Sequence, residues 1–253
     1  MTVGCQGCRS ESQNFDLAMA FQPIIDIEKG SVFAFEALVR GSQGESATAV
    51  LSRVTPDNRY AFGQQCRVTA IKEAVNAGIL DTDAKLSINF LPNAVYSPAA
   101  CIQLTISTAS EVGFPAERLI LEFTENEQIA DTKHIQNIIA TYREMGFTTA
   151  IDDFGAGHAG LGLLVQFQTD LLKLDMDLIR GIDKSEPRRV VVAGVMDIAK
   201  ALGISVIAEG IETSGEYTVL RDLGVRYMQG YFLAKPGFQK LPLPIMGGFT
   251  EKV

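Results

Sequence analysis

The sequence lacks the features that mark a membrane-spanning, secreted or nucleic-acid-binding chain. It has no run of about 18 or more apolar residues, so no membrane span is expected. Its start, MTVGCQGCRSESQNFD, has no basic stretch followed by an apolar one, so it does not read as a secretory signal. Basic residues number 22 against 30 acidic ones, and the net charge of −8 argues against a DNA partner. We therefore expect a cytoplasmic protein.

Cysteine and histidine are also scarce. Cys5 and Cys8 have the spacing of a zinc-ligand pair, but no second cysteine pair follows to complete a site. We interpret the four cysteines as reduced thiols, with a redox or metal role for this pair as the alternative. The two histidines, His134 and His158, do not end apolar runs, which disfavours zinc.

Short apolar runs alternate with amphipathic segments along most of the chain. After a polar leader (residues 1–16), MAFQPIIDI and SVFAFEALVR read as two strands joined by a turn at Gly30. KLSINF, RLILEFTE, FTTAIDD, DLLKLD, ISVIAEG and VRYMQGYF then alternate with helical segments such as EPRRVVVAGVMDIAKALG. This pattern predicts one α/β domain at residues 17–245, a TIM-type (β/α)8 barrel. An open doubly wound sheet is the alternative, although no GxGxxG follows the first strand.

Seven of the apolar runs finish on a polar side chain, most of them oxygen-bearing. These residues are Glu36, Asn89, Glu122, Asp152 with Asp153, Lys173, Glu209 and Gln229. A single acidic residue in such a place commonly caps a helix. In a β/α barrel, however, the carboxyl ends of the strands converge on one face, where active sites are built. The repetition therefore predicts a cluster.

The chemistry of such a cluster indicates a divalent metal site. Five carboxylates in one pocket repel one another and would not all stay ionised without cations. Oxygen ligands without His or Cys suit Mg²⁺ or Mn²⁺. Adjacent aspartates can share two metal ions about 3.5–4 Å apart, as in phosphoester hydrolases. Lys173 would orient the attacking water or neutralise phosphate charge, and Arg40 would grip a phosphate oxygen.

Eight motifs, in order, resemble those of the EAL family, the cyclic di-GMP phosphodiesterases. They are QPIID, FEALVR, NFLP, EFTEN, DDFGAG, KLD, AEGIE and QGYFLAKP, and they extend over about residues 17–240. The resemblance implies a modified TIM barrel in which one strand runs antiparallel to the others. It also implies hydrolysis of cyclic di-GMP to linear 5′-pGpG with Mg²⁺ or Mn²⁺, two ions per site.

The resemblance also implies roles for individual residues. Glu36, Asn89, Glu122 and Asp152 would hold one metal ion, and Asp152, Asp153 and Glu209 the second. Lys173 would contact the nucleophilic water, and Glu209 is the general base in an alternative one-metal scheme. Gln22, Leu38, Arg40, Gln229 and Pro236 would line the dinucleotide site. Glu125 would support the loop that follows Asp153.

Two other functions remain open at this point. Many members of the family have lost catalysis, so a catalytically weak cyclic di-GMP receptor is the main alternative. The complete carboxylate set favours the enzyme, because a receptor does not need to activate water. A metal-dependent enzyme acting on another phosphate ester is disfavoured by the match at the substrate-contact positions. The wide apolar face of RRVVVAGVMDIAKAL, together with the resemblance, predicts a homodimer, and no motif indicates a regulatory partner.

Overall fold

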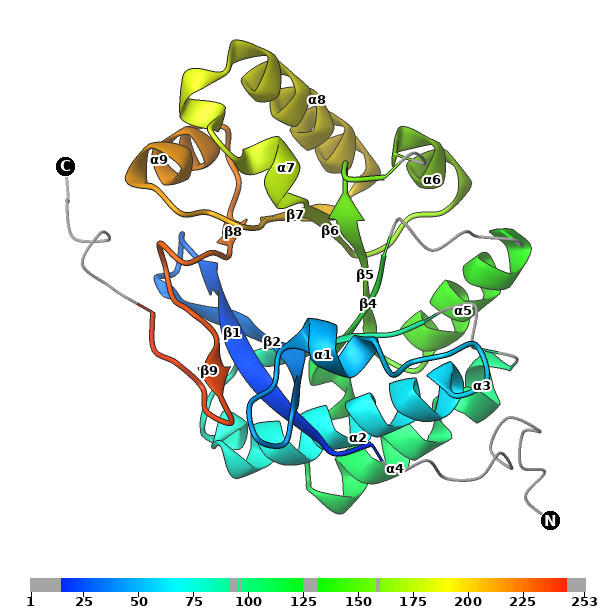
Figure 1. Ribbon diagram of the computed structural model, residues 1–253. Helices are drawn as coiled ribbons and strands as arrows, with labels where there is room; N and C mark the ends of the chain where they lie inside the picture. The colour runs from blue at the N-terminus through cyan, green and yellow to red at the C-terminus, as the bar shows by residue number, and fades with distance from the viewer. Residues whose placement is uncertain (1–14, 92–94, 96, 125–131, 158–159, 245–253) are drawn as a thin grey trace.

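The computed structural model describes residues 15–91, 95, 97–124, 132–157 and 160–244 (Figure 1). Within these residues, eight strands close into a barrel and a ninth short strand adds to β1. The strands are β1 (Leu17–Asp26), β2 (Ser31–Gly41), β3 (Lys85–Asn89), β4 (Leu119–Thr124), β5 (Thr148–Phe154), β6 (Leu171–Leu174), β7 (Ser205–Ala208), β8 (Tyr227–Met228) and β9 (Gly237–Phe238).

The predicted modified TIM barrel is confirmed, including its single reversed strand. Strands β2 to β8 pair in parallel in chain order, whereas β1 runs antiparallel to both β2 and β8. The cause is local, because a parallel pair needs a long crossover and only a tight turn joins β1 to β2. Asp26 Oδ1 accepts hydrogen bonds from the backbone N–H groups of Glu28 and Lys29, and Gly30 takes the positive φ of 64°.

Helices surround the barrel and cover its outer face (Figure 1). They are α1 (Ala47–Leu51), α2 (Arg59–Asn76), α3 (Pro98–Cys101), α4 (Gln103–Glu111), α5 (Thr132–Glu144), α6 (Gly160–Gln166), α7 (Met176–Ile179), α8 (Glu186–Leu202) and α9 (Ser214–Asp222). Thr213 and Glu216 form a capping box at the start of α9, and Gly203 ends α8 at a positive φ of 72°. None of the helices in the described ranges is long and apolar enough to cross a membrane.

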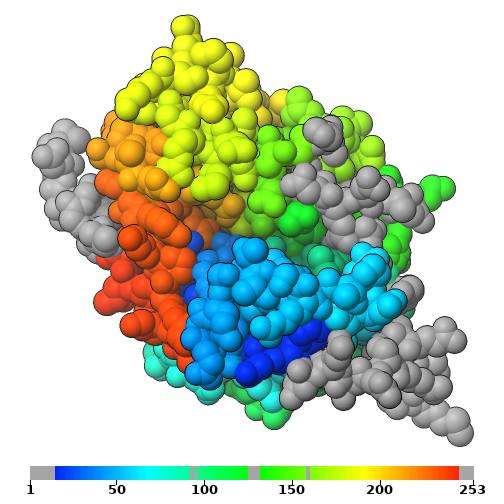
Figure 2. Space-filling model, in the orientation of Figure 1, coloured from blue at the N-terminus to red at the C-terminus, as the bar shows by residue number. Residues whose placement is uncertain are grey.

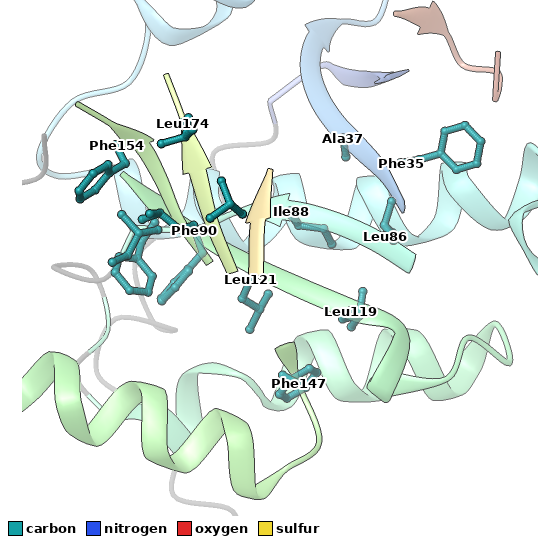
Figure 3. Close-up of a cluster of buried hydrophobic side chains, with 14 of the residues drawn as sticks. Phe35, Ala37, Leu86, Ile88, Phe90, Leu119, Leu121, Phe147, Phe154 and Leu174 are labelled. Carbon is teal, nitrogen blue, oxygen red and sulfur yellow. The ribbon is translucent and has the colours of Figure 1, made fainter. Parts of the chain in front are cut away.

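The two-residue period of the strands divides the core into two layers. On β4, Leu119, Leu121 and Phe123 point outward into the large cluster between barrel and helices, part of which Figure 3 shows. Ile120 points inward and joins five residues from other strands that fill the inside of the barrel. These are Ile24, Ala34, Ala150, Leu171 and Ile207. We call these six inward side chains the apolar plug. Polar groups further along the strands lie above it.

Strand β2 extends past Glu36, as the expected strand SVFAFEALVR requires, and ends one residue beyond that expected strand. Strand β2 continues to Gly41, because β1 pairs with it along its whole length, ending at the pair Leu17 and Gly41. The parallel partner β3 stops earlier, with Ile88 opposite Ala37. Glu36 therefore lies near the end of the parallel pairing, and the remainder of β2 forms a ribbon with β1. This ribbon and α1 rise over the barrel end and lie at the front of the molecule in Figure 2.

Candidate active site

The inward positions above the apolar plug are polar on most strands. Two residues after an inward apolar residue, the next inward side chain is polar. The apolar residues Ala34, Ile120, Ala150, Leu171 and Ile207 are followed in this way by Glu36, Glu122, Asp152, Lys173 and Glu209. Gln22 on β1 and Gln229 just after β8 face the same space. Except for Glu209, which is partly buried, all of these side chains are buried. Strand pleating alone thus brings residues from seven strands into one polar layer.

Lys173 lies at the centre of this layer. Its Nζ is 2.7 Å from Glu209 Oε1, 2.9 Å from Asp152 Oδ1, 3.0 Å from Glu122 Oε2 and 3.3 Å from Glu36 Oε1. Among the described residues, Lys173 is the only basic residue that forms an ion pair with any of these four carboxylates. One ammonium therefore faces four acids, and the layer carries an excess of potential negative charge.

The pKa values of this layer reflect burial and mutual repulsion. Burial would lower the pKa of Lys173, but the surrounding carboxylates raise it well above its usual range, so the lysine stays protonated. Burial raises the pKa of Glu122 and of Glu209, and neighbouring carboxylates add to the rise while Lys173 opposes it. Burial, followed by the charges of Asp152 and Asp175, raises the pKa of Asp153 to about 6. Ionising the whole layer thus requires further positive charge.

The carboxylates form two groups that share one residue. Oxygens of Glu36, Glu122 and Asp152 lie within 4.8 Å of one another, and so do oxygens of Asp152, Asp153 and Glu209. Both groups consist of carboxylates, which are ligands suited to Mg²⁺ and Mn²⁺ rather than zinc. The set fits two hard divalent ions with Asp152 between them, and such ions would supply the missing positive charge.

An unusual backbone angle brings Asp153 into the second group. Consecutive residues of a strand point to opposite faces, so Asp153 would normally point away from Asp152. Asp153 instead has a positive φ of 56°, a conformation that aspartate tolerates better than most residues. Its backbone N–H donates to Asp152 Oδ1 at 3.0 Å, and the pairing of β5 with β6 is irregular between Ile151 and Phe154. This kink places adjacent carboxylates on the same side.

A cavity of about 340 Å³ opens above the carboxylates. It is lined by Gln22, Glu36, Leu38, Asp152, Asp153, Glu209 and Gln229 together with Asp175, Met176, Gly210, Glu212, Gly230 and Tyr231. Gln229 Nε2 donates to Glu36 Oε2 at 2.7 Å, and its buried Oε1 has no hydrogen-bond partner in the described part of the chain. Gln22 Nε2 donates to the carbonyl oxygen of Ala234 at 3.1 Å. Gln229 therefore offers a free acceptor to a ligand.

A second, more apolar cavity of about 720 Å³ adjoins the first. It lies between β2, α1, α2 and β3, and it meets the first cavity at Leu38, Asp152 and Asp153. Arg40 and Asn89 line this larger space, and Asn89 is paired in register with Glu122 on β4. The two cavities therefore lie side by side along the carboxylates, and together they are called the groove below.

Two residues named from the sequence are not placed in this groove. Pro236 does not line either cavity; it follows Ala234, the acceptor of Gln22, by two residues. Glu125 lies outside the described residues, as do Cys5 and Cys8.

Cys66 and Cys101 are free thiols, and burial raises the pKa of Cys66 to about 12, so it is not a reactive thiolate.

Sequence reasoning missed several residues around the site. Ser87 donates to Glu122 Oε1 at 2.5 Å, and its position two residues before Asn89 on the same face of β3 was the available signal. Asp175, Glu212 and Tyr231 stand inside the motifs KLD, AEGIE and QGYFLAKP but had no expected role, and Met176 begins α7 directly after Asp175. Their convergence depends on closure of the barrel.

Comparison with known proteins identifies the family. A family model for the EAL domain matches residues 8–236, and the chain belongs to this family. A standalone versatile EAL protein from Vibrio cholerae O395, solved in its c-di-GMP-bound form, is 47% identical. The match has a TM-score of 0.90 and covers 95% of this chain and 100% of that one. BlrP1 of Klebsiella pneumoniae, solved with manganese and cyclic di-GMP, is 30% identical with a TM-score of 0.84. That match covers 92% of this chain and 60% of BlrP1.

Curated relatives carry different names. The blue light- and temperature-regulated antirepressor BluF of Escherichia coli is 29% identical over 88% of this chain and 55% of its own length. The probable cyclic di-GMP phosphodiesterase PdeB of Escherichia coli is 30% identical over 88% of this chain and 43% of its own length. The chain thus spans about half the length of these two relatives, and their names include both an enzyme and a regulator.

Proposed function

We propose that the chain hydrolyses cyclic di-GMP to linear 5′-pGpG with Mg²⁺ or Mn²⁺. The observation that carries this proposal is the pair of carboxylate groups sharing Asp152 at the floor of the groove. A receptor needs the groove, but it does not need five acids gathered around an excess of negative charge. EAL proteins solved with cyclic di-GMP, one of them with manganese, support the substrate class.

The residues present fit two metal ions. Glu36, Asn89, Glu122 and Asp152 would hold one, and Asp152, Asp153 and Glu209 would hold the other. Bound Mg²⁺ or Mn²⁺ would lower the pKa of a coordinated water and offset the charge of the phosphate. In the reaction, a water oxygen adds to phosphorus, the bond from phosphorus to the 3′ oxygen breaks, and that oxygen leaves with a proton.

The side chains of the chain have complementary roles in this reaction. Lys173 stays protonated and supplies a fixed positive charge beside the attacking water. Glu209 supplies negative charge, either as a metal ligand or as the acceptor of the water proton. Gln22, Leu38, Arg40 and Gln229, which line the groove, contact the dinucleotide. Gln229 Oε1 is a buried acceptor suited to an N–H group of guanine, and Arg40 pairs with a phosphate oxygen.

A cyclic di-GMP receptor is the second candidate, and one observation favours it. BluF, a relative that matches most of this chain, is named as an antirepressor rather than as an enzyme. Both candidates place the ligand in the same groove and differ only in whether water is activated. We assign either activity to the domain at residues 17–245, in a cytoplasmic protein.

Exposed apolar residues on two helices support a homodimer. Val165 on α6 is 84% exposed, and Val190 and Val191 on α8 are 65% and 49% exposed. A second copy of the chain would cover such residues in a self-complementary contact. Light scattering during gel filtration should give twice the monomer mass, and a monomer at micromolar concentration would contradict the dimer.

One incubation separates the candidates. The protein is mixed with cyclic di-GMP in Mg²⁺, Mn²⁺, Ca²⁺ or EDTA, and the products are resolved by chromatography. We expect 5′-pGpG with Mg²⁺ and Mn²⁺ and no product in EDTA. Ca²⁺ should support binding with little turnover, because its variable coordination positions water poorly. Binding without product in both Mg²⁺ and Mn²⁺ would establish the receptor instead.

A further inference from the structure

Ser87 is a buried hydroxyl that belongs to the polar layer of the barrel. It is 0% exposed and points inward from β3, between Leu86 and Ile88, which pack outward. Its Oγ donates to Glu122 Oε1 at 2.5 Å, a length typical of a strong hydroxyl–carboxylate hydrogen bond. On β4, β5 and β7, the equivalent inward position two residues before the acid carries an apolar residue of the plug. A hydroxyl at this position of β3 is therefore not needed to fill the core.

The two oxygens of Glu122 have different partners. Oε1 is held by Ser87, whereas Oε2 lies 3.0 Å from Lys173 Nζ, which also contacts Glu36 and Asp152. A carboxylate with one oxygen fixed in this way cannot rotate freely about its last side-chain bond. Oε2 is therefore presented to the centre of the cluster before any cation arrives.

We propose that Ser87 is a positioning residue that sets the metal affinity of the group formed by Glu36, Glu122 and Asp152. This inference rests on the proposed function, in which that group holds a metal ion. Ser87 touches neither the metal nor the substrate and acts through Glu122. Without the hydroxyl, Oε1 loses its partner while buried, and the carboxylate turns to share Lys173 or a water. Loss of such a supporting hydrogen bond typically weakens metal binding about 10–100-fold.

The effect should be confined to one of the two groups. Ser87 donates to Glu122, which belongs to the first group, whereas no hydrogen bond joins Ser87 to Asp153 or Glu209 in the described part of the chain. A Mn²⁺ titration of the Ser87→Ala protein should therefore show one weakened site and one unchanged site. A general loss of stability would weaken both sites.

The same barrel contains a matched control. Thr149 on β5 is also 0% exposed, and its hydroxyl donates to Asp170 Oδ2 at 2.9 Å. This pair lies near the start of β5, and neither residue lines the two cavities. Thr149→Val removes a buried hydroxyl that donates to a carboxylate, while Asp170 Oδ2 keeps its bond from the Thr149 backbone N–H. The control therefore reproduces the packing change away from the carboxylate cluster.

The test is calorimetric titration of Mn²⁺ into the metal-free full chain, without substrate. We expect Ser87→Ala to weaken one Mn²⁺ site about 10–100-fold and Thr149→Val to change neither site by more than about twofold. Ser87→Cys, which puts a larger and weaker donor in place of the hydroxyl, should behave like Ser87→Ala. In turnover assays, the Mn²⁺ concentration for half-maximal rate should rise for Ser87→Ala, while kcat at saturating Mn²⁺ and the KM for cyclic di-GMP should stay within about threefold of wild type.

The outcomes distinguish the role of Ser87 from the proposed enzyme activity. Equal Mn²⁺ affinity in wild type and Ser87→Ala, or wild-type affinity in Ser87→Cys, overturns the role of Ser87. Two sites in wild type without hydrolysis of cyclic di-GMP overturn the proposed enzyme and leave the Mn²⁺ comparison valid. Absence of Mn²⁺ binding in wild type overturns both.

Discussion

Lys173 lies on β6 and Glu209 directly follows the neighbouring strand β7, and their charged atoms are 2.7 Å apart at the floor of the groove. The lysine shares its ammonium with three further carboxylates. The chain therefore carries its own cation in the place where negative charge is most concentrated. The ammonium group reduces the repulsion among the carboxylates when metal ions are absent. Because one positive charge faces four acids, it does not neutralise them fully.

Replacing this lysine should destabilise the metal-free protein. Lys173→Met leaves four buried or partly buried carboxylates without their shared cation, and we expect a loss of about 3–5 kcal/mol in the free energy of unfolding in EDTA. Mn²⁺ should recover part of the loss, because it binds only the folded cluster. The measurement is urea unfolding with and without Mn²⁺.

Lys72 provides the control for that substitution. It pairs with Glu111 at 3.4 Å, and both side chains are exposed. Lys72→Met should cost less than about 1 kcal/mol, with no dependence on Mn²⁺. Equal losses for Lys72→Met and Lys173→Met in EDTA would show that Lys173 does not neutralise the cluster.

The raised pKa of Asp153 predicts a particular dependence of stability on pH. Its pKa rises from 3.8 to about 6 on folding, so the folded chain holds this proton more tightly than the unfolded chain. The contribution of Asp153 to stability is present below the unfolded value and is lost as pH rises through about 6. In EDTA, the Tm of the wild-type protein should therefore fall between pH 4 and 6 by more than the Tm of the Asp153→Asn protein.

Mn²⁺ should reverse that trend, because it binds the deprotonated carboxylate. Mn²⁺ affinity in wild type should increase over the same pH range, and the increase should be smaller in Asp153→Asn. Parallel Tm curves for the two proteins in EDTA would mean that Asp153 ionises in the folded state as freely as in the unfolded chain.

Glu209 separates binding from turnover. Glu209→Gln keeps the size and one carbonyl oxygen but removes the negative charge, so turnover should fall by roughly 10²–10⁴-fold. Binding of cyclic di-GMP, measured by calorimetry in Ca²⁺, should weaken only modestly, because Arg40, Gln22 and Gln229 remain. Glu111→Gln on α4 is the matched control and should retain wild-type turnover. Turnover of Glu209→Gln within a few-fold of wild type would remove Glu209 from the chemistry.

The backbone that follows Glu209 should tolerate no side chain at Gly210. This glycine has a positive φ of 69°, and an added Cβ would collide with the Cβ of Met176. Gly113 has a similar φ of 71° with nothing within 4 Å of an added Cβ. Gly113→Ala should cost about 1–2 kcal/mol from backbone strain alone, and Gly210→Ala about 1–3 kcal/mol more. Thermal unfolding measures both, and equal costs would show that Met176 moves aside freely.

The sequence predicted the barrel and most of the acidic layer because both follow from periodicity. Apolar runs ending on Glu122, Asp152 and Glu209 indicate strands whose inward side chains continue one period beyond the plug. The strand expected at SVFAFEALVR ends within one residue of the end of β2, and the pairing with β1 accounts for its extension past Glu36.

Details that depend on depth and backbone rotation were not predictable. The central place of Lys173 follows from its full burial among strands that are distant in sequence. The side chain of Asp153 reaches the cluster only through its positive φ. Nothing in the sequence around Ser87 indicates its hydrogen bond to Glu122, because that contact depends on the pairing of β3 with β4.

The reversed direction of β1 also decides on which side of the molecule the chain enters the barrel. Leu17 pairs with Gly41, so β1 begins at the end of the barrel where the groove opens. Phe15, two residues before β1, packs edge to face against Phe62, which lines the larger cavity. In an all-parallel barrel the first strand would begin at the opposite end. Here, a probe attached at residue 15 would report on occupancy of the groove, whereas one attached in the turn between β1 and β2 would be a full strand length away.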